Sequence, residues 1–272
     1  MRLLHAARKP SHINPPTQIY RNSVPTHPSH PADAPTRIVL EQGTPARPYV
    51  DMTLVALRDF GGDARWSDTD TISITPTPLR ARDYQVEPDA SAASYLLALP
   101  AIFGGRVTVP NLGSSSVQGD AGFCQVLARM GARIEQGPTH TTVTGTGSLH
   151  GAVLDLADMP DMTLTAAVLA LHARGRTEIH NVEILRHHES DRLAAAATEL
   201  RKLGATVEEL PGSLIIDPPT TPTRDVAIDT YLDHRMAMAF SLAGHVEIRD
   251  PACVGKTFPR YFEVLRQLGM LA

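Results

Sequence analysis

The stretch "MTLTAAVLALHA", residues 162–173, decides the fold because hardly any of its positions can face water. A helix that is apolar nearly all round must be covered by other elements on every side. Two further runs have the same character: "SAASYLLALPAI" at 91–102 and the small, apolar residues from Met236 to Leu242. The sequence therefore predicts inner helices with sheets around them.

These three helices belong to an internal repeat. Asp89, Asp161 and Asp233 precede them at spacings of 72 and 72 residues, and an alternating strand follows each one: "GRVTVPN" from 105, "GRTEIHN" from 175 and "GHVEIRD" from 244. Aspartate is a favoured N-cap because its carboxylate accepts the free amide hydrogens of the first turn. We therefore expect all three aspartates to cap their helices.

A second series interleaves with the first. "LRDFG", "LARMG", "LRKLG" and "LRQLG" end at glycines 61, 131, 204 and 269, and a strand, a turn and a strand follow each of the first three. A helix that ends at a glycine and leads into a hairpin explains this pattern. The predicted unit is helix, strand, helix, strand, strand in about 70 residues, which indicates an α/β (α+β) fold.

Composition excludes several classes of protein. A net charge of −4 and a pI near 6.3 do not favour a nucleic-acid partner. No apolar run approaches the roughly 20 residues that span a bilayer, so no membrane partner is expected. The two cysteines, Cys124 and Cys253, cannot form a metal cluster alone and indicate a reducing, cytoplasmic location.

Residues 1–36 differ from the rest of the chain. They hold seven of the 22 prolines and four histidines, with almost no apolar periodicity. Such a composition buries too little surface to offset the entropy of ordering. We expect a disordered, proline-rich extension.

The copies of the repeat differ at a few charged positions. His234 and Arg235 occur only in the last copy, Arg192 stands where the preceding copy has Ala121, and Lys256 comes just before the last helix. A cation at a helix start is unfavourable unless an anion binds there. A shared anion would explain all three cations. The alternative is that each cation pairs with a neighbouring carboxylate.

Four segments carry a resemblance to a known family: "YLDHRMAMAFSL", "HHESDRLAAAATELRKLGA", "EPDASAASYLLA" and "DPACVGKTFPRYF". Over about residues 45–270 the chain resembles the C-terminal half of the 5-enolpyruvylshikimate-3-phosphate synthases (3-phosphoshikimate 1-carboxyvinyltransferases). The resemblance implies an inside-out α/β barrel, or prism, with helices inside and sheets outside. It also implies enolpyruvyl transfer from phosphoenolpyruvate to the 5-hydroxyl of shikimate 3-phosphate, with these two small-molecule substrates and with no metal or organic cofactor.

The resemblance also assigns the phosphoenolpyruvate side of the site. It implies that Arg192, Arg235 and Lys256 hold the carboxylate and phosphate of this substrate. Planar guanidinium groups bind such anions through paired hydrogen bonds. Glu189 matches the carboxylate that transfers a proton at the enolpyruvyl methylene carbon, and His234 shapes or protonates the same site.

On the shikimate side, the resemblance assigns Asp161 as the base for the attacking hydroxyl and Tyr49 as an aromatic neighbour of the ring. His188 stands where the family usually has a lysine on the substrate phosphate, and it can donate to phosphate when protonated. Ala46 replaces a usual serine and Leu232 a usual asparagine. Ile184 lies where an asparagine can occur. These departures weaken the shikimate-phosphate side more than the phosphoenolpyruvate side.

The family's amino-terminal segments, namely a Lys-Ser pair, a glycine-rich segment and a Ser-Ser-Gln run, have no counterpart here. We expect residues 37–86 to be a remnant of the first family domain and residues 87–272 to be the second, in a truncated chain that is inactive alone. A first domain supplied by another polypeptide stays open. The alternatives are a non-catalytic anion-binding module, a relative of UDP-N-acetylglucosamine enolpyruvyl transferase, or metal binding by "HHE" at 187–189.

Overall fold

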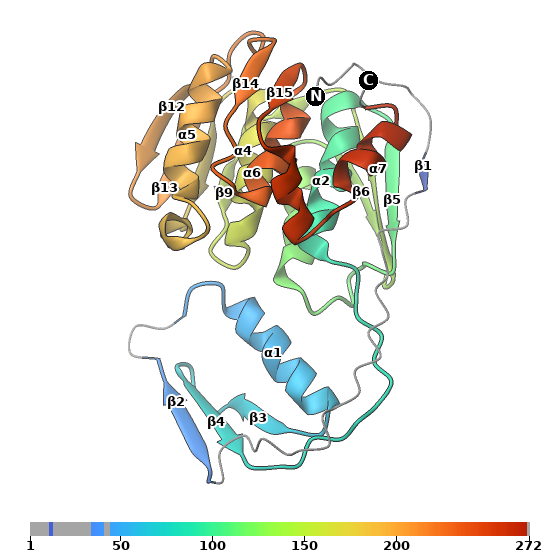
Figure 1. The fold of residues 1–272 in the computed structure, drawn as a ribbon, viewed down its shortest axis with the longest axis vertical. Coiled ribbons are helices and arrows are strands. Elements are labelled where there is room, and N and C mark those ends of the chain that lie inside the picture. Colours follow the sequence, from blue (N-terminus) through green and yellow to red (C-terminus); the bar gives the residue numbers. More distant parts are fainter. Residues whose placement is uncertain (1–10, 13–33, 41–43, 271–272) are drawn as a thin grey trace.

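The computed structural model describes residues 11–12, 34–40 and 44–270. They form a small unit and a large unit joined by residues 76–89, which have no regular structure (Figure 1). Prolines 76, 78 and 88 in this connection lack the N–H that a helix or sheet would require.

The small unit is one helix on a three-stranded antiparallel sheet of order β2-β4-β3. Its own core consists of Leu54 from the helix and Ala64 and Ile72 from the sheet. The elements are β2 (Thr36–Val39), α1 (Arg47–Asp59), β3 (Asp63–Trp66) and β4 (Thr71–Thr75).

The large unit surrounds three inner helices, as the sequence predicts. All nine residues of α4 (Thr163–Leu171) are buried. So are most of α2 (Ala90–Phe103) and all of α6 (His234–Phe240) except Arg235. These helices and the layers around them share one continuous hydrophobic core. The expected enolpyruvate transferase-like architecture, with helices inside and sheets outside, is confirmed (Figure 1).

Sheets cover the inner helices in the order of the repeat. The first has the order β1-β5-β7-β6, the second β12-β13-β11-β9, and the third pairs β14 with β15 in parallel. The strands of these sheets are β1 (Ser11–His12), β5 (Arg106–Pro110), β6 (Arg133–Gln136), β7 (His140–Thr144), β9 (Val153–Asp155), β11 (Thr177–His180), β12 (Thr206–Leu210), β13 (Ser213–Asp217), β14 (Val226–Ile228) and β15 (Val246–Ile248). A short parallel pair, β8 (Leu149–His150) with β10 (Ala173–Arg174), lies beside the second inner helix.

Further helices complete the copies. Three are α-helices: α3 (Phe123–Arg129), α5 (Arg192–Lys202) and α7 (Tyr261–Gln267). Five are 3-10 helices: η1 (Gly119–Gly122), η2 (Pro160–Met162), η3 (Glu183–His187), η4 (Ser241–Ala243) and η5 (Pro251–Lys256).

The predicted glycine ends of helices are confirmed. Gly61, Gly131, Gly204 and Gly269 all have φ between 71° and 106°. Each donates its N–H to the carbonyl three residues earlier. This left-handed conformation suits glycine, which has no Cβ to clash.

Three expectations need correction. Within residues 1–36, Ser11–His12 forms a short strand along β5 and Thr36 begins β2, while most of this segment lies outside the described residues. Lys256 does not stand at a helix start, because it ends η5 and α7 begins only at Tyr261.

The third correction concerns Asp161. Asp89 and Asp233 do cap α2 and α6, since their side chains accept from the amides of Ala92 and Arg235. Asp161 lies inside the 3-10 turn that begins at Pro160, and no side chain caps α4. An N-cap needs a residue outside the helical turn, so the Asp161 carboxylate is free for other contacts.

Among the described residues, no helix is long and apolar enough to cross a membrane.

Candidate active site

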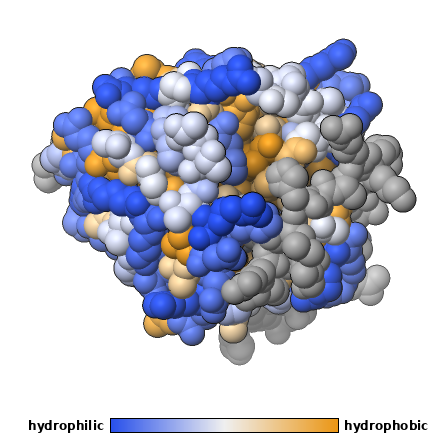
Figure 2. Space-filling model, turned by 90° about the horizontal axis from the view of Figure 1, so that it is seen from above, coloured by the Kyte–Doolittle hydropathy of each residue, from blue (hydrophilic) through white to orange (hydrophobic). Residues whose placement is uncertain are grey.

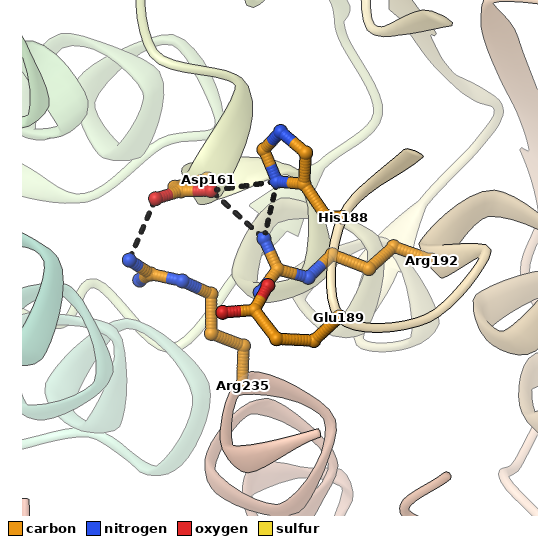
Figure 3. A pocket seen from close by; sticks show the side chains of 5 residues that line it. All are labelled: Asp161, His188, Glu189, Arg192 and Arg235. Carbon is orange, nitrogen blue, oxygen red and sulfur yellow. Dashed lines mark hydrogen bonds and ion pairs between the residues drawn. The ribbon is translucent and has the colours of Figure 1, made fainter. Parts of the chain in front are cut away.

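A hollow of about 420 Å³ lies at the residues where α4, α5 and α6 begin. Five charged or titratable side chains from two copies of the repeat line it (Figure 3): Asp161, His188, Glu189, Arg192 and Arg235. All five are site residues that the family resemblance predicts. The fold therefore brings together side chains up to 74 positions apart in the chain.

Asp161 is the centre of this cluster. Its Oδ1 accepts from Arg192 Nη1 at 2.9 Å, and its Oδ2 accepts from Arg235 Nη2 at 2.6 Å. In Figure 3 the carboxylate lies between the two guanidinium groups. The repeat alone predicts that this carboxylate caps a helix. In the structure it binds two guanidinium groups instead.

A buried carboxylate fixes the side chain of Arg192 on the side away from the hollow. Its side chain is only 1% exposed, and its Nε donates to Oδ2 of the fully buried Asp233 at 2.8 Å. A guanidinium group carries five donors in a rigid plane, so this bond fixes the direction of the others. The bonds of Arg192 to Asp161 and Glu189 point toward the hollow.

Glu189 bridges two cations. Its Oε2 accepts from Arg192 Nη2 at 2.7 Å, and its Oε1 accepts from Lys256 Nζ. Burial opposes ionisation, but the hydrogen bond from Lys256 and the charges of both cations outweigh it and lower the pKa of Glu189 to about 2. Glu189 is thus a firmly ionised carboxylate at neutral pH. Lys256 does not line the hollow and acts on it through Glu189.

The two histidines differ in their placement. His188 lines the hollow, and its Nδ1 lies 3.0 Å from Arg192 Nη1. Arginine can only donate, so Nδ1 accepts and Nε2 carries the proton. Burial and the nearby Arg192 lower the pKa of His188, which makes it a neutral hydrogen-bond donor at neutral pH. The expected role of His188 as a phosphate ligand stays a prediction.

His234 lies behind the site. It is 2% exposed, does not line the hollow, and its Nδ1 is 3.6 Å from Asp233 Oδ1. Burial and the charge of Arg235 lower its pKa. In this position it can influence the packing around Arg235, but it has no direct path to the hollow.

Tyr49 comes from α1 in the small unit and reaches the large unit, where its hydroxyl donates to Asp120 Oδ1 at 2.8 Å. Asp120 also accepts from the Ser91 hydroxyl. Sequence reasoning missed both partners and Tyr95, a fully buried residue of α2 close enough to Arg235 to affect its ionisation. The repeat offered one signal for Ser91, which occupies the place of Arg235 in its own copy.

Two of the sequence departures lie around the same site. Ala46 precedes α1 with a left-handed φ of 55°, and its N–H donates to the Ala157 carbonyl at 3.1 Å. Leu232 directly precedes Asp233, has a φ of 57° and is 77% exposed. An exposed leucine in this backbone region is unusual, and no contact in the structure explains it.

Among the described residues there is no group of three or more histidine, cysteine, aspartate or glutamate side chains that could hold a metal ion.

Comparisons with known proteins agree on one family. Residues 29–265 match the sequence model of EPSP synthase (3-phosphoshikimate 1-carboxyvinyltransferase). The 3-phosphoshikimate 1-carboxyvinyltransferase of Vibrio atlanticus is 44% identical over 246 residues, which are 88% of this chain and 57% of the relative. The enzyme of the same name from Erwinia tasmaniensis is 45% identical over 243 residues, 87% of this chain and 56% of the relative.

Solved structures show the same fold. EPSP synthase from Acinetobacter baumannii aligns with a TM-score of 0.73 at 24% identity over 88% of this chain and 57% of its own. The enolpyruvyl transferase NikO from Streptomyces tendae aligns with a TM-score of 0.68 at 21% identity over 87% and 56%. The chain spans a little over half the length of the curated relatives it matches.

Proposed function

The chain belongs to the EPSP synthase family, and on that premise we propose that it provides the phosphoenolpyruvate-binding part of a 3-phosphoshikimate 1-carboxyvinyltransferase. The proposed reaction transfers the enolpyruvyl group of phosphoenolpyruvate to the 5-hydroxyl of shikimate 3-phosphate and releases phosphate, a step toward chorismate and aromatic amino acids. One observation carries the proposal: Arg192 and Arg235 converge on Asp161 at the hollow. A cytoplasmic site of action fits the two free cysteines.

In this proposal Arg192, Arg235 and Lys256 bind the anionic groups of phosphoenolpyruvate. Arg192 is suited to a fixed role because Asp233 already holds its Nε. Lys256 is suited to a mobile role because its side chain is 56% exposed and bonds only Glu189 among the described residues. The substrate would replace carboxylates of the protein as partner of these cations.

Asp161 is the proposed base. The substrate hydroxyl loses its proton to the carboxylate as its oxygen attacks C2 of the enolpyruvyl group. Both Asp161 oxygens already accept hydrogen bonds from guanidinium groups, which hold the carboxylate in place. The same guanidinium groups must shift partly to the substrate for the oxygen to accept this proton.

Glu189 is the proposed acid, and its role depends on substrate binding. Protonation of the methylene carbon makes C2 electrophilic, and the hydroxyl oxygen then bonds to it. Loss of phosphate and of the added proton restores the double bond. With a pKa of about 2 in the free chain, Glu189 cannot give a proton at neutral pH. When a phosphate group takes Lys256 and Arg192 as partners, the interactions that lower this pKa are weakened.

The remaining assigned residues are Tyr49 and His188 on the shikimate side and His234 on the phosphoenolpyruvate side. We assign Tyr49 to the ring and His188 to the phosphate, where His188 would donate from Nε2 as a neutral ring. His234 would act by packing near Arg235. Of these three residues, His188 lines the hollow.

The test combines binding with complementation. Isothermal titration of the 272-residue chain with phosphoenolpyruvate measures the proposed half-site, and Arg235→Met should abolish the signal. Phosphate release is then measured with both substrates, with and without the part of the Vibrio atlanticus enzyme that this chain does not match. We expect release in the mixture and none with an Asp161→Ala chain. Binding without release in any mixture would favour the anion-binding module, and absence of binding would refute the proposal.

A further inference from the structure

Asp120 is a buried carboxylate in the first copy of the repeat. It lies on η1, is 3% exposed, and accepts from two hydroxyl groups, those of Tyr49 at 2.8 Å and of Ser91. Its hydrogen bonds among the described residues include none from lysine or arginine. A buried carboxylate without a cationic partner is costly, and burial raises the pKa of Asp120.

The repeat shows that Asp120 is not there as a helix cap. Its counterpart 71 positions later, Asp191, caps α5 by accepting from the amide of Ala194. Asp120 lies within η1, and neither η1 nor α3 has a side-chain cap. The local role of Asp191 therefore does not explain why an aspartate is buried at position 120.

Asp120 instead fixes the start of α1 against the large unit. Pro48 packs so closely on Gly119 that a Cβ added there would lie 2.7 Å from the proline Cβ. The Ala46 N–H donates to the Ala157 carbonyl in the same region. The hydrogen bond from the Tyr49 hydroxyl to Asp120 adds a contact between two side chains to this region. It places the phenol beside Asp161 and Arg235, whose charges act on it.

The direction of this bond determines what Tyr49 can recognise. A phenol has one proton, and Tyr49 gives it to Asp120. Burial and the carboxylates of Asp120 and Asp161 raise the pKa of Tyr49 well above its usual value, so the phenol stays protonated. The lone pairs that remain can only accept. The ligand group at this point must be a donor, such as a hydroxyl, and not a phosphate or carboxylate.

We propose that Asp120 is a positioning residue that holds the Tyr49 phenol as a hydrogen-bond acceptor for a ring hydroxyl of the acceptor substrate. The inference rests on the proposed function and adds a rule of selectivity to it. The site then has two chemically different parts. Hydroxyl groups bind at Tyr49, next to the hollow, and anionic groups bind at Arg192 and Arg235, which line it.

The test measures two ligands on the same variants of the 272-residue chain. Dissociation constants for shikimate 3-phosphate and for phosphoenolpyruvate are determined for wild type, Tyr49→Phe, Asp120→Ala and the double variant. Each single variant should weaken shikimate 3-phosphate roughly tenfold, as for one lost hydrogen bond, and the double variant should be no weaker than either. Phosphoenolpyruvate binding should change less than about twofold. Additive losses, or equal losses for both ligands, would overturn the proposal.

Two controls separate positioning from folding and from the proposed function. Asp120→Asn keeps an acceptor for Tyr49 and should recover most of the affinity that Asp120→Ala loses. The ligand-free readout is the ultraviolet titration of Tyr49, taken as the difference from Tyr49→Phe. In Asp120→Ala this phenol should ionise at lower pH than in wild type, and an unchanged titration contradicts the role of Asp120 even if the chain binds neither ligand. If the titration shifts as expected but the wild-type chain does not bind phosphoenolpyruvate, the result counts against the proposed function alone.

Discussion

Replacing Arg192 by methionine removes the most buried cation of the site. Methionine has no charge and an unbranched side chain that replaces arginine as far as about Nε, so the change deletes the guanidinium group and keeps most of the aliphatic part. Five hydrogen bonds are lost: Nε to Asp233 at 2.8 Å, Nη2 to Asp233 at 3.4 Å, Nη1 to Asp161 at 2.9 Å, Nη2 to Glu189 at 2.7 Å, and Nη1 to His188 at 3.0 Å. Asp233, which is fully buried, keeps hydrogen bonds with Ser190 and the Arg235 amide and the contact with His234 Nδ1 at 3.6 Å.

The expected cost follows from that buried carboxylate. Removing one partner of a buried ion pair destabilises a protein by roughly 3–5 kcal/mol, because the other charge is left without compensation. We expect a loss of this size in the free energy of unfolding of the large unit, measured in urea. The small unit has its own core around Leu54 and should unfold as it does in wild type.

A matched control is available on the surface. Arg176 makes a comparable two-bond contact with Asp217, at 3.0 and 2.8 Å, with both side chains largely exposed. Arg176→Met should leave unfolding unchanged, because solvent screens this pair. Adding Asp233→Asn to Arg192→Met should restore part of the loss. A loss below about 1 kcal/mol for Arg192→Met would refute the claim that the cluster depends on a buried, compensated charge.

The other predictions concern charge, pH and backbone strain. Asp161→Asn should tighten binding of inorganic phosphate about tenfold in calorimetry, because it removes a carboxylate that competes for two cations, and it should lower the free energy of unfolding, because the buried Arg192 and Arg235 lose their shared partner. Lys256→Met should raise the pKa of Glu189 from about 2, followed by carbon-13 NMR, because its hydrogen bond to Lys256 is lost; an unmoved resonance would contradict this. Burial lowers the pKa of His172 to about 4 from 6.5, so the unfolded chain binds more protons between these values, and stability should fall by about 3 kcal/mol as pH drops through this range, but not in His172→Phe. Leu232→Asn should stabilise the chain by roughly 1 kcal/mol in urea unfolding, since asparagine tolerates the left-handed backbone at this exposed position.

The inner helices could be predicted from sequence because nearly every residue in them is apolar or small. A run such as 162–173 has no polar face, and the glycine that ends each unit needs a left-handed backbone wherever it occurs. Both signals are local. They do not depend on which other part of the chain covers the helix.

Asp161 shows where local reasoning stops. It shares its place in the repeat with Asp89 and Asp233, yet Pro160 starts a 3-10 turn that takes Asp161 out of the cap position. Its real partners, Arg192 and Arg235, lie 31 and 74 positions away. The family resemblance indicated a role in the site, but only the fold shows that the capping role is absent.

Asp120 could not be found from sequence for a related reason. It has no neighbouring cation to mark it, and its repeat counterpart Asp191 is an ordinary cap. Its partners are two neutral hydroxyl groups, one of them 71 positions away in the small unit. A carboxylate that binds hydroxyl groups leaves no charge pattern in a sequence.

The charge balance of the site links binding to chemistry. Three cations, Arg192, Arg235 and Lys256, are paired with three carboxylates, Asp161, Glu189 and Asp233, so these six groups carry no net charge among themselves. An anionic substrate gains little from such a cluster unless it takes cations away from carboxylates. The buried Asp233 keeps its hold on Arg192, whereas the partly exposed Glu189 can give up Lys256. Under the proposed function, the substrate would therefore weaken the contact that keeps Glu189 ionised, and the acid that the reaction needs would arise from the binding step itself.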